Sequence, residues 1–293
     1  MRVYRRTRGI FRNAAIRREI ESLDPERDHC RIVQLLGAYE FPFDITRSLE
    51  FALFRTYISP SISDLLHRTG QFLNAGQKRY DDTSLLIGEF LENGYDSPRG
   101  RQAIERMNAI HGRFQISNDD YLFVLSTFIF EPIDWLDRFG WRRLTRIERQ
   151  AIYVFWREVG RRMHLRDIPD SLAAFRAWVE EYKNRNVRYA QSNREVAEAT
   201  MNITKGWLPS FARPLVAPVV NALLDPQMRA AFGFGRPVPG LAFLLNGILK
   251  LRALLIAPFA FERYPSRLAH TRWRSYPDGY EIDQLGPLSE KKR

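Results

Sequence analysis

Cysteine is almost missing from this sequence, and histidine is scarce. Cys30 is the single cysteine in 293 residues, so the chain cannot form an internal disulfide or a metal centre with several thiolate ligands. Among the five histidines, His29 ends the only Glu-x-x-His motif, which begins at Glu26. A carboxylate-bridged di-iron site needs two such motifs, so we expect His29 to be a surface histidine.

Long hydrophobic runs are missing as well. A membrane-spanning helix needs about 18 or more consecutive apolar residues, and the nearest approach, residues 238–261, is interrupted by Lys250, Arg252 and Pro258. The basic N-terminus is not followed by the apolar core of a secretory signal. We therefore expect a cytoplasmic protein. The basic N-terminus and the apolar segment leave peripheral membrane contact open.

The motifs of several common chemistries are absent. The sequence has no Gly-x-Gly-x-x-Gly or Gly-Lys-Ser/Thr loop to bind phosphates, and no His-Glu-x-x-His motif to bind zinc. It also has no Gly-x-Ser-x-Gly turn to carry a nucleophilic serine. These absences argue against a nucleotide-binding enzyme, a zinc protease and a serine hydrolase.

Acidic residues are fewer than basic ones. The chain has 34 Asp and Glu against 45 Lys and Arg, a formal net charge of +11. Such an excess is typical of proteins that bind nucleic acid, an anionic membrane surface or an anionic cofactor, and also of an ordinary solvated basic surface. The arginines are scattered, with a denser cluster only within residues 2–18. This distribution does not favour a nucleic-acid partner.

Helix start signals recur along the sequence, and strand signals are almost absent. Three dipeptides place proline at the first helical position after a capping residue: Ser59-Pro60, Ser97-Pro98 and Asp225-Pro226. Residues 145–148 and 192–195 have the spacing of capping boxes. The pattern predicts an all-α protein, with helices over residues 60–73 and 98–114.

The chain is predicted to fold as one large helical domain. Its 45% hydrophobic content is ample for a packed core. Residues 121–135 are apolar nearly all round, which is typical of a central buried helix, here with Pro132 inside it. We divide the chain into a basic N-terminal segment (1–30), a helical domain (31–262) and an irregular tail (263–293).

His111 is the histidine with the strongest functional case. At 100° per residue it lies within about 50° of the centre of the apolar face formed by Ile104, Met107, Ile110 and Phe114. One interpretation is a core histidine hydrogen-bonded to a carbonyl group. The other is a neutral imidazole that ligates a metal held otherwise by a cofactor, as in haem proteins with one protein ligand. By contrast, His67 and His164 are predicted to face away from their apolar stripes, and His270 lies in the tail.

Thr69 and Arg68 form a second candidate pair. Thr69 lies at the middle of the apolar stripe of the predicted helix 60–73, and Arg68 lies at its margin. The threonine hydroxyl could simply bond back to its own helix. Alternatively, the two residues would place a hydroxyl and a cation at the edge of a buried pocket, where arginine is a natural partner for a carboxylate such as a haem propionate.

Five stretches of the sequence stand out together: residues 39–42, 65–72, 78–83, 106–113 and 120–170. In their order and spacing they resemble a known family, the catalytic domain shared by the fungal MpaB oxygenases and the bacterial latex-clearing proteins. The resemblance covers roughly residues 30–200.

The resemblance implies a globin-like helical core, one haem b and an axial histidine at the position of His111. It implies that Arg68 and Thr69 match an Arg/Lys-Thr pair near the distal haem pocket, and that Glu50 is the closest match by spacing to a distal catalytic glutamate. Rubber-cleaving members are secreted and flank the histidine with arginines, whereas Asn108 and Gln115 stand at those positions here. Polyisoprene is therefore not the expected substrate.

These observations predict a haem-dependent oxygenase that acts with O₂ on an apolar substrate, such as an isoprenoid or a lipid-like molecule. They do not choose between C=C cleavage and hydroxylation, and they do not fix the substrate, the electron donor or the oligomeric state. The alternative is a non-enzymatic helical protein that binds lipid or a membrane surface. Its support is the basic N-terminus and the apolar segment 207–261.

Overall fold

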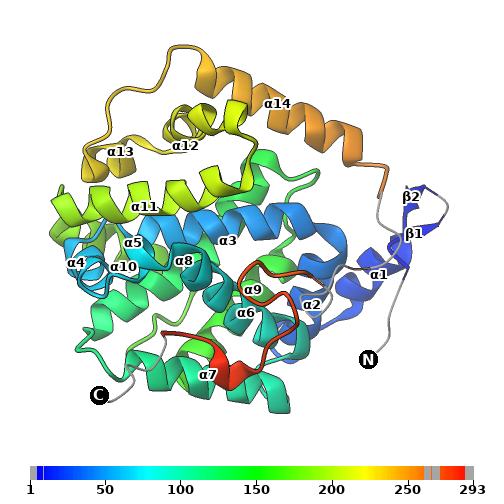
Figure 1. Ribbon diagram of the computed structural model, residues 1–293. Coiled ribbons are helices and arrows are strands. Elements are labelled where there is room, and N and C mark those ends of the chain that lie inside the picture. The colour runs from blue at the N-terminus through cyan, green and yellow to red at the C-terminus, as the bar shows by residue number, and fades with distance from the viewer. Residues whose placement is uncertain (1–4, 9, 261–264, 266–270, 288–293) are drawn as a thin grey trace.

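The computed structural model describes residues 5–8, 10–260, 265 and 271–287. A short hairpin of two strands with two residues each, β1 (Thr7–Arg8) and β2 (Phe11–Arg12), lies near the start of the described chain. Helices account for most of the rest (Figure 1). The helical elements are α1 (Ala14–Ser22), α2 (His29–Leu35), η1 (Leu36–Glu40), α3 (Pro42–Thr56), α4 (Pro60–Arg68), α5 (Gln71–Asn74), α6 (Gly76–Asn93), α7 (Pro98–His111), α8 (Asn118–Phe139), α9 (Arg146–Arg162), α10 (Leu172–Asn186), α11 (Gln191–Trp207), η2 (Ser210–Leu215), α12 (Val216–Leu223), α13 (Pro226–Phe232), α14 (Leu241–Ile256) and η4 (Ile282–Gln284).

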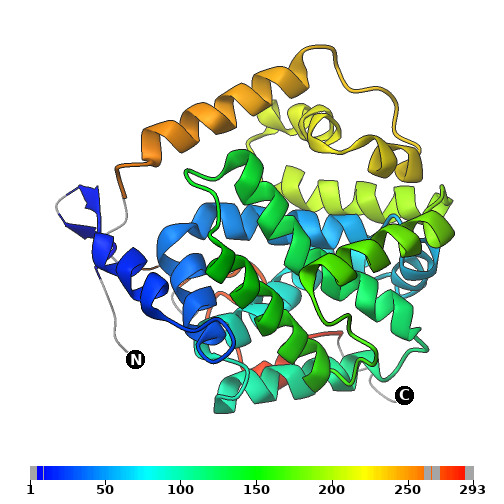
Figure 2. The same ribbon diagram turned by 180° about the vertical axis from the view of Figure 1, so that it is seen from behind.

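The helices pack around one core with α8 at its centre. α8 packs along α3, α2 packs against α9, α6 against α7, and α4 against α11. Figures 1 and 2 show α14 at the periphery of the molecule, where it packs against α12 and α8. The prediction of a single all-α domain is confirmed; the globin-like character of the core stays a prediction.

The predicted helix boundaries are confirmed where capping chemistry is strong. Ser97 Oγ accepts a hydrogen bond from the backbone N–H of Gly100 at 3.0 Å, and Asp225 Oδ1 accepts one from Met228 at 2.8 Å. Thr145 and Glu148 form a complete capping box at the start of α9. Each bond satisfies an N–H group that the first helical turn leaves without an intrahelical partner. The central apolar segment is α8, with Pro132 inside it.

Three predictions about the helices are wrong in detail. The helix expected over residues 60–73 is divided into α4 and α5, because Gly70 adopts a left-handed conformation (φ +64°) that interrupts the helix. The helix expected to reach residue 114 ends at His111. In addition, Ser192 lies inside the first turn of α11 and does not cap it; its hydroxyl contacts that of Ser63 at 3.0 Å.

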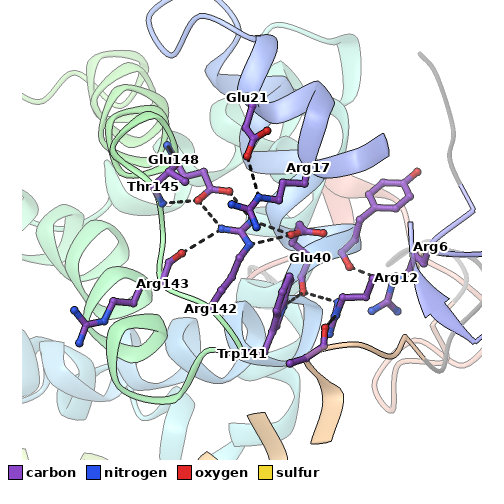
Figure 3. A network of polar contacts seen from close by, with 12 residues as sticks. Arg6, Arg12, Arg17, Glu21, Glu40, Trp141, Arg142, Arg143, Thr145 and Glu148 are labelled. Carbon is purple, nitrogen blue, oxygen red and sulfur yellow. Dashed lines mark hydrogen bonds and ion pairs between the residues drawn. The ribbon is translucent and has the colours of Figure 1, made fainter. Parts of the chain in front are cut away.

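A buried ion-pair network ties the start of α9 to the N-terminal part of the chain (Figure 3). Arg142 Nη2 lies 2.8 Å from Glu40 Oε2 and 2.7 Å from Glu148 Oε1. Burial opposes the charge of Arg142, but the two carboxylates outweigh it and raise the pKa of the guanidinium. On the other side of Glu40, its backbone carbonyl accepts hydrogen bonds from Trp141 and Arg12 at 3.0 and 3.3 Å.

The two ends of the described chain are packed against the helical body. Ile16 and Ile20 of α1 are buried in the common core, and so are Ile282 and Leu285 near the C-terminus. In Figure 1 the C-terminal segment, in red, crosses α6 and reaches α7. Apart from η4 the described part of this segment is irregular. The domain limits at residues 30 and 262 stay predictions.

Among the described helices none combines the length and the hydropathy that crossing a bilayer demands.

Candidate functional site

A cavity of about 550 Å³ lies inside the helical bundle. This volume is within the range typical of pockets for small molecules and cofactors, roughly 300–1,000 Å³. Its walls come from α3 to α9, from α11, α12 and α14, and from Gly286 and Pro287 near the C-terminus. Most lining side chains are apolar, including Phe72, Phe128 and Trp156. The few polar side chains are therefore the ones that give the cavity its chemistry.

His111, the last residue of α7, lines this cavity. Its Nδ1 atom is buried and has no hydrogen-bond partner among the described residues. The carbonyl partner of a simple core histidine is therefore not present at this atom. Burial, and secondarily the charge of Arg79, lowers the pKa of His111 from 6.5 to about 4. The imidazole is thus neutral at physiological pH, the form that ligates a metal. The ring of Tyr121 packs edge-on against it, with centroids 5.7 Å apart.

Arg79 of α6, which is partly buried, brings a positive charge to the same cavity. Its guanidinium donates a hydrogen bond to Thr83 Oγ1 and lies 5.4 Å from the ring centre of Phe72. No ion pair joins it to a carboxylate in the described part of the chain, and burial lowers its pKa. The nearby Asp82 is engaged elsewhere: Lys78 Nζ lies 2.8 Å from it, and Tyr276 donates a hydrogen bond to it. A partly buried cation without an ion-paired carboxylate favours an anionic ligand.

Glu50 of α3 lies on the wall between the main cavity and a second one of about 400 Å³. The Tyr80 hydroxyl donates a hydrogen bond to Glu50 Oε1 at 2.6 Å, and Arg47 Nη2 lies 2.7 Å from the same atom. Burial raises the pKa of Glu50 even though Arg47 and Tyr80 act in the opposite direction. The carboxyl group is therefore poised to exchange a proton closer to neutral pH than an ordinary glutamate.

The pair predicted at residues 68 and 69 is divided by the structure. Thr69 lines the cavity, but its hydroxyl donates to the Leu66 carbonyl of its own helix at 2.7 Å. Arg68 is exposed at the end of α4 and is not among the residues that line the cavity. The sequence suggested Arg68 as a cation at the cavity, but in the structure Arg79 lines the cavity and Arg68 does not.

The other histidines have ordinary structural surroundings. The prediction that His29 lies on the surface is wrong: it is buried, with Nδ1 3.0 Å from the Glu26 carbonyl oxygen and Nε2 against the Tyr95 hydroxyl. His67 is half-exposed beside Glu195, with 2.6 Å between Nε2 and Oε2. His164 is exposed just after α9. His270 lies outside the described residues.

Sequence reasoning singled out the stretch 78–83 for its resemblance but missed Arg79 as a site residue. A signal was available, because Arg79 and Thr83 are four residues apart and share one helix face. Burial of that face could not be inferred from hydropathy, since α6 carries charged residues on several sides. No group of three His, Cys, Asp or Glu side chains arranged to hold a metal ion occurs in the described ranges.

Comparison with known proteins gives a consistent picture. Residues 65–252 match the family described as ER-bound oxygenase mpaB/B′/Rubber oxygenase, catalytic domain. The ER-bound oxygenase mpaB′ of Penicillium brevicompactum is 30% identical over 261 residues, which are 83% of this chain and 62% of that relative. The ER-bound oxygenase mpaB of Penicillium roqueforti (strain FM164) is 33% identical over 210 residues, 66% of this chain and 70% of the relative.

A third relative, the ER-bound oxygenase mpaB of Penicillium brevicompactum, is 33% identical over 224 residues. This match covers 67% of the chain and 57% of the relative, so the chain spans roughly three fifths of the length of the two Penicillium brevicompactum proteins. The family match includes more than half of the chain and contains Arg79 and His111. The chain belongs to the mpaB and rubber oxygenase catalytic-domain family.

Proposed function

We propose that this protein is a haem b-dependent oxygenase that uses O₂ on an apolar substrate. The observation that carries the proposal is His111, a neutral imidazole on the wall of a largely apolar cavity with a buried Nδ1 atom that lacks a partner. A buried polar atom without a hydrogen bond is unfavourable by about 1–3 kcal/mol. A ligand bound at the imidazole would supply the interaction that no described residue provides.

The residues around the cavity fit an iron porphyrin. His111 would hold the iron, and Arg79, a partly buried cation without an ion-paired carboxylate, would hold a propionate. The apolar walls match the porphyrin face and exclude water. Haem iron, when bound, supplies the one-electron and O₂ chemistry that protein side chains lack.

The remaining polar groups of the cavity can act on the substrate. Glu50, with its raised pKa, can hold or release a proton at Oε1, and the Tyr80 hydroxyl orients that carboxyl group. The rest of the lining offers few polar partners, so a substrate would be recognised by shape and hydrophobic burial. This favours an isoprenoid or another lipid-like molecule over a charged metabolite.

The proposal is tested by absorption spectroscopy on the purified protein. We expect a Soret band with about one haem per chain, and we expect His111→Ala to lose the band or to retain haem weakly, with partial recovery when free imidazole is added. His67→Ala and His164→Ala are matched controls, because neither residue lines the cavity, and both should keep the wild-type spectrum. A colourless wild-type protein that cannot be reconstituted with haem would overturn the proposal and favour the alternative of a lipid-binding protein.

A further inference from the structure

Helix α14 presents an apolar face to the outside of the molecule. Six of its side chains are large, hydrophobic and exposed, among them Phe243 at 85% and Leu254 at 72% of full exposure. The other four are Leu244, Ile248, Leu251 and Leu255. Scattered exposed hydrophobic residues are common, but a contiguous apolar patch on one helix marks an interaction surface.

The two sides of α14 are sharply divided. At 100° per residue the exposed positions, from Phe243 to Leu255, fall on one arc of about 160°. The single charged residue on this arc, Lys250, lies at its edge, where its long side chain can reach beyond the apolar patch. Arg252 is on the opposite arc, and its Nη1 lies 3.0 Å from Asp44 Oδ1 in the body of the protein. The exposed arc could therefore enter an apolar environment without burying a charged group.

The segment of the chain that contains this face is predominantly basic. Residues 199–260 contain six basic residues (Lys205, Arg213, Arg229, Arg236, Lys250 and Arg252) and a single acidic one, Asp225. Asp225 is paired with Arg55, 2.7 Å away. An apolar helix face within a basic segment is complementary to the surface of an anionic bilayer: the apolar side chains can contact the acyl chains, and the basic side chains can contact the phosphates of the headgroups. It does not match a protein partner that contributes acidic side chains alone.

The N-terminal hairpin extends this face beyond the end of α14. Ile10 and Phe11 are 64% and 55% exposed, and the ring of Phe11 stacks on Phe259 with centroids 5.6 Å apart. Arg12 Nε donates to the carbonyls of Ile256 and Ala257 at 3.0 and 3.1 Å, so the end of the helix is fixed to the hairpin. In Figures 1 and 2 the hairpin lies next to that end of α14.

The same face is continuous with the cavity. Ile248 is 52% exposed and also lines the cavity, together with Leu245 and Leu249 of α14. The cavity thus reaches the surface of the protein beside the apolar arc. A molecule dissolved in acyl chains that met this face would not have to cross water to enter.

We propose that the outer face of α14, with Ile10 and Phe11, docks on an anionic lipid bilayer and places the mouth of the cavity against the acyl chains. The docking itself does not depend on a cofactor. Entry of the substrate from the bilayer rests on the function proposed above.

The test is vesicle flotation of the full chain with phosphatidylcholine vesicles, with and without phosphatidylserine, at low and high salt. We expect the wild type to float with the vesicles that contain phosphatidylserine and to be partly released by high salt. The double variant Phe243→Glu, Leu254→Glu should reduce the bound fraction roughly tenfold or more, because two charges would enter the apolar layer. Both side chains are exposed, so the change should leave the fold intact.

The matched control is Leu73→Glu, which changes a leucine of α5 that is 51% exposed and lies outside the proposed face. It should bind vesicles as the wild type does. The proposal is overturned if the wild type does not float, if the double variant floats equally well, or if Leu73→Glu loses binding to the same degree. It is also overturned if sedimentation shows that the face joins two copies of the chain and vesicles do not compete with this association.

A Soret spectrum of the same preparations separates the two proposals. A double variant that keeps haem and loses vesicle binding supports docking and leaves the oxygenase proposal intact. A wild type that binds vesicles but never binds haem supports docking and overturns the oxygenase proposal alone.

Discussion

His111 and Arg79 reach the same cavity from two helices that pack against each other, α7 and α6. Each carries a polar group that the described protein does not fully satisfy: an unpartnered Nδ1 in His111 and a guanidinium without a carboxylate in Arg79. Such groups are unfavourable in an empty apolar cavity and favourable beside a ligand that supplies a metal and an anion. The effect of each residue on ligand binding can therefore be measured separately from its effect on the stability of the apoprotein.

Under the proposed haem-binding function, replacing Arg79 with leucine should weaken haem retention without destabilising the apoprotein. Hydrogen bonds to a charged group contribute about 1.5–3 kcal/mol, so we expect haem to dissociate about ten- to a hundredfold more readily. The apoprotein should unfold at the same or a higher urea concentration, because a partly desolvated cation without an ion-paired carboxylate has been removed. The control, Arg68→Leu, changes an exposed arginine and should alter neither quantity. Equal haem retention in both variants would contradict the role of Arg79.

The depressed pKa of His111 predicts how the apoprotein responds to acid. In the unfolded chain the imidazole binds a proton near pH 6.5, but in the folded protein only near pH 4. Its contribution to stability is therefore present above pH 6.5 and is lost as the pH falls toward 4, by roughly 3 kcal/mol in total. His111→Gln should remove this part of the pH dependence. Urea unfolding of both apoproteins between pH 7.5 and 4.5 measures the difference; parallel curves would show that His111 is not buried in its neutral form.

At the scale of elements, the network around Arg142 connects η1, the loop before α9 and the capping box of α9 (Figure 3). Glu40 and Glu148 are 4% and 1% exposed, and both carboxylates pair with Arg142. Removing one partner of a buried ion pair leaves an uncompensated charge, which is much less favourable than the original pair.

Arg142→Met should therefore destabilise the protein by about 3–5 kcal/mol, measured by chemical denaturation. The control is Arg176→Met. Arg176 pairs with Asp134 at 2.8 Å, but both side chains are about half exposed, and an exposed pair contributes about 0–1 kcal/mol. If the two variants lost the same small amount of stability, the network would have no special role in holding α9 in place.

At the scale of the whole molecule, the C-terminal segment closes part of the cavity wall. Leu285 is fully buried, and its carbonyl accepts a hydrogen bond from Arg106 of α7 at 2.7 Å. The next residue, Gly286, has φ +99° and lines the cavity; a Cβ atom there would lie 2.5 Å from Ile110. The segment is thus shaped to fit against α7 beside His111.

Leu285→Ala should cost about 2–5 kcal/mol, the range for truncating a buried leucine, and should make haem easier to lose because the wall beside α7 loosens. Unfolding in urea and the rate of haem transfer to an acceptor protein measure the two effects. Leu73→Ala, at an exposed position, should change stability by less than about 0.5 kcal/mol. An unchanged Leu285→Ala protein would mean that the segment does not close the cavity.

Features that depend on local chemistry could be predicted from the amino-acid sequence alone. Capping residues located the starts of α7, α9 and α13, the apolar segment around Pro132 predicted the buried α8, and helical phasing turned His111 toward the interior. These features depend on residues a few positions apart, so they are readable from the chain alone. The family resemblance and the all-α class were available at the same level.

Which charged residues are enclosed depends on how the helices pack in three dimensions. Arg68 and Arg79 look alike in the sequence, but packing leaves Arg68 exposed and encloses Arg79 beside His111. His29, expected at the surface, is buried because Tyr95, distant in sequence, covers it. The apolar segment at α14 has its inner arc against α8 and α12 and its outer arc uncovered. Burial of a polar group depends on residues far along the chain that supply its partners and cover, and local hydropathy contains no information about them.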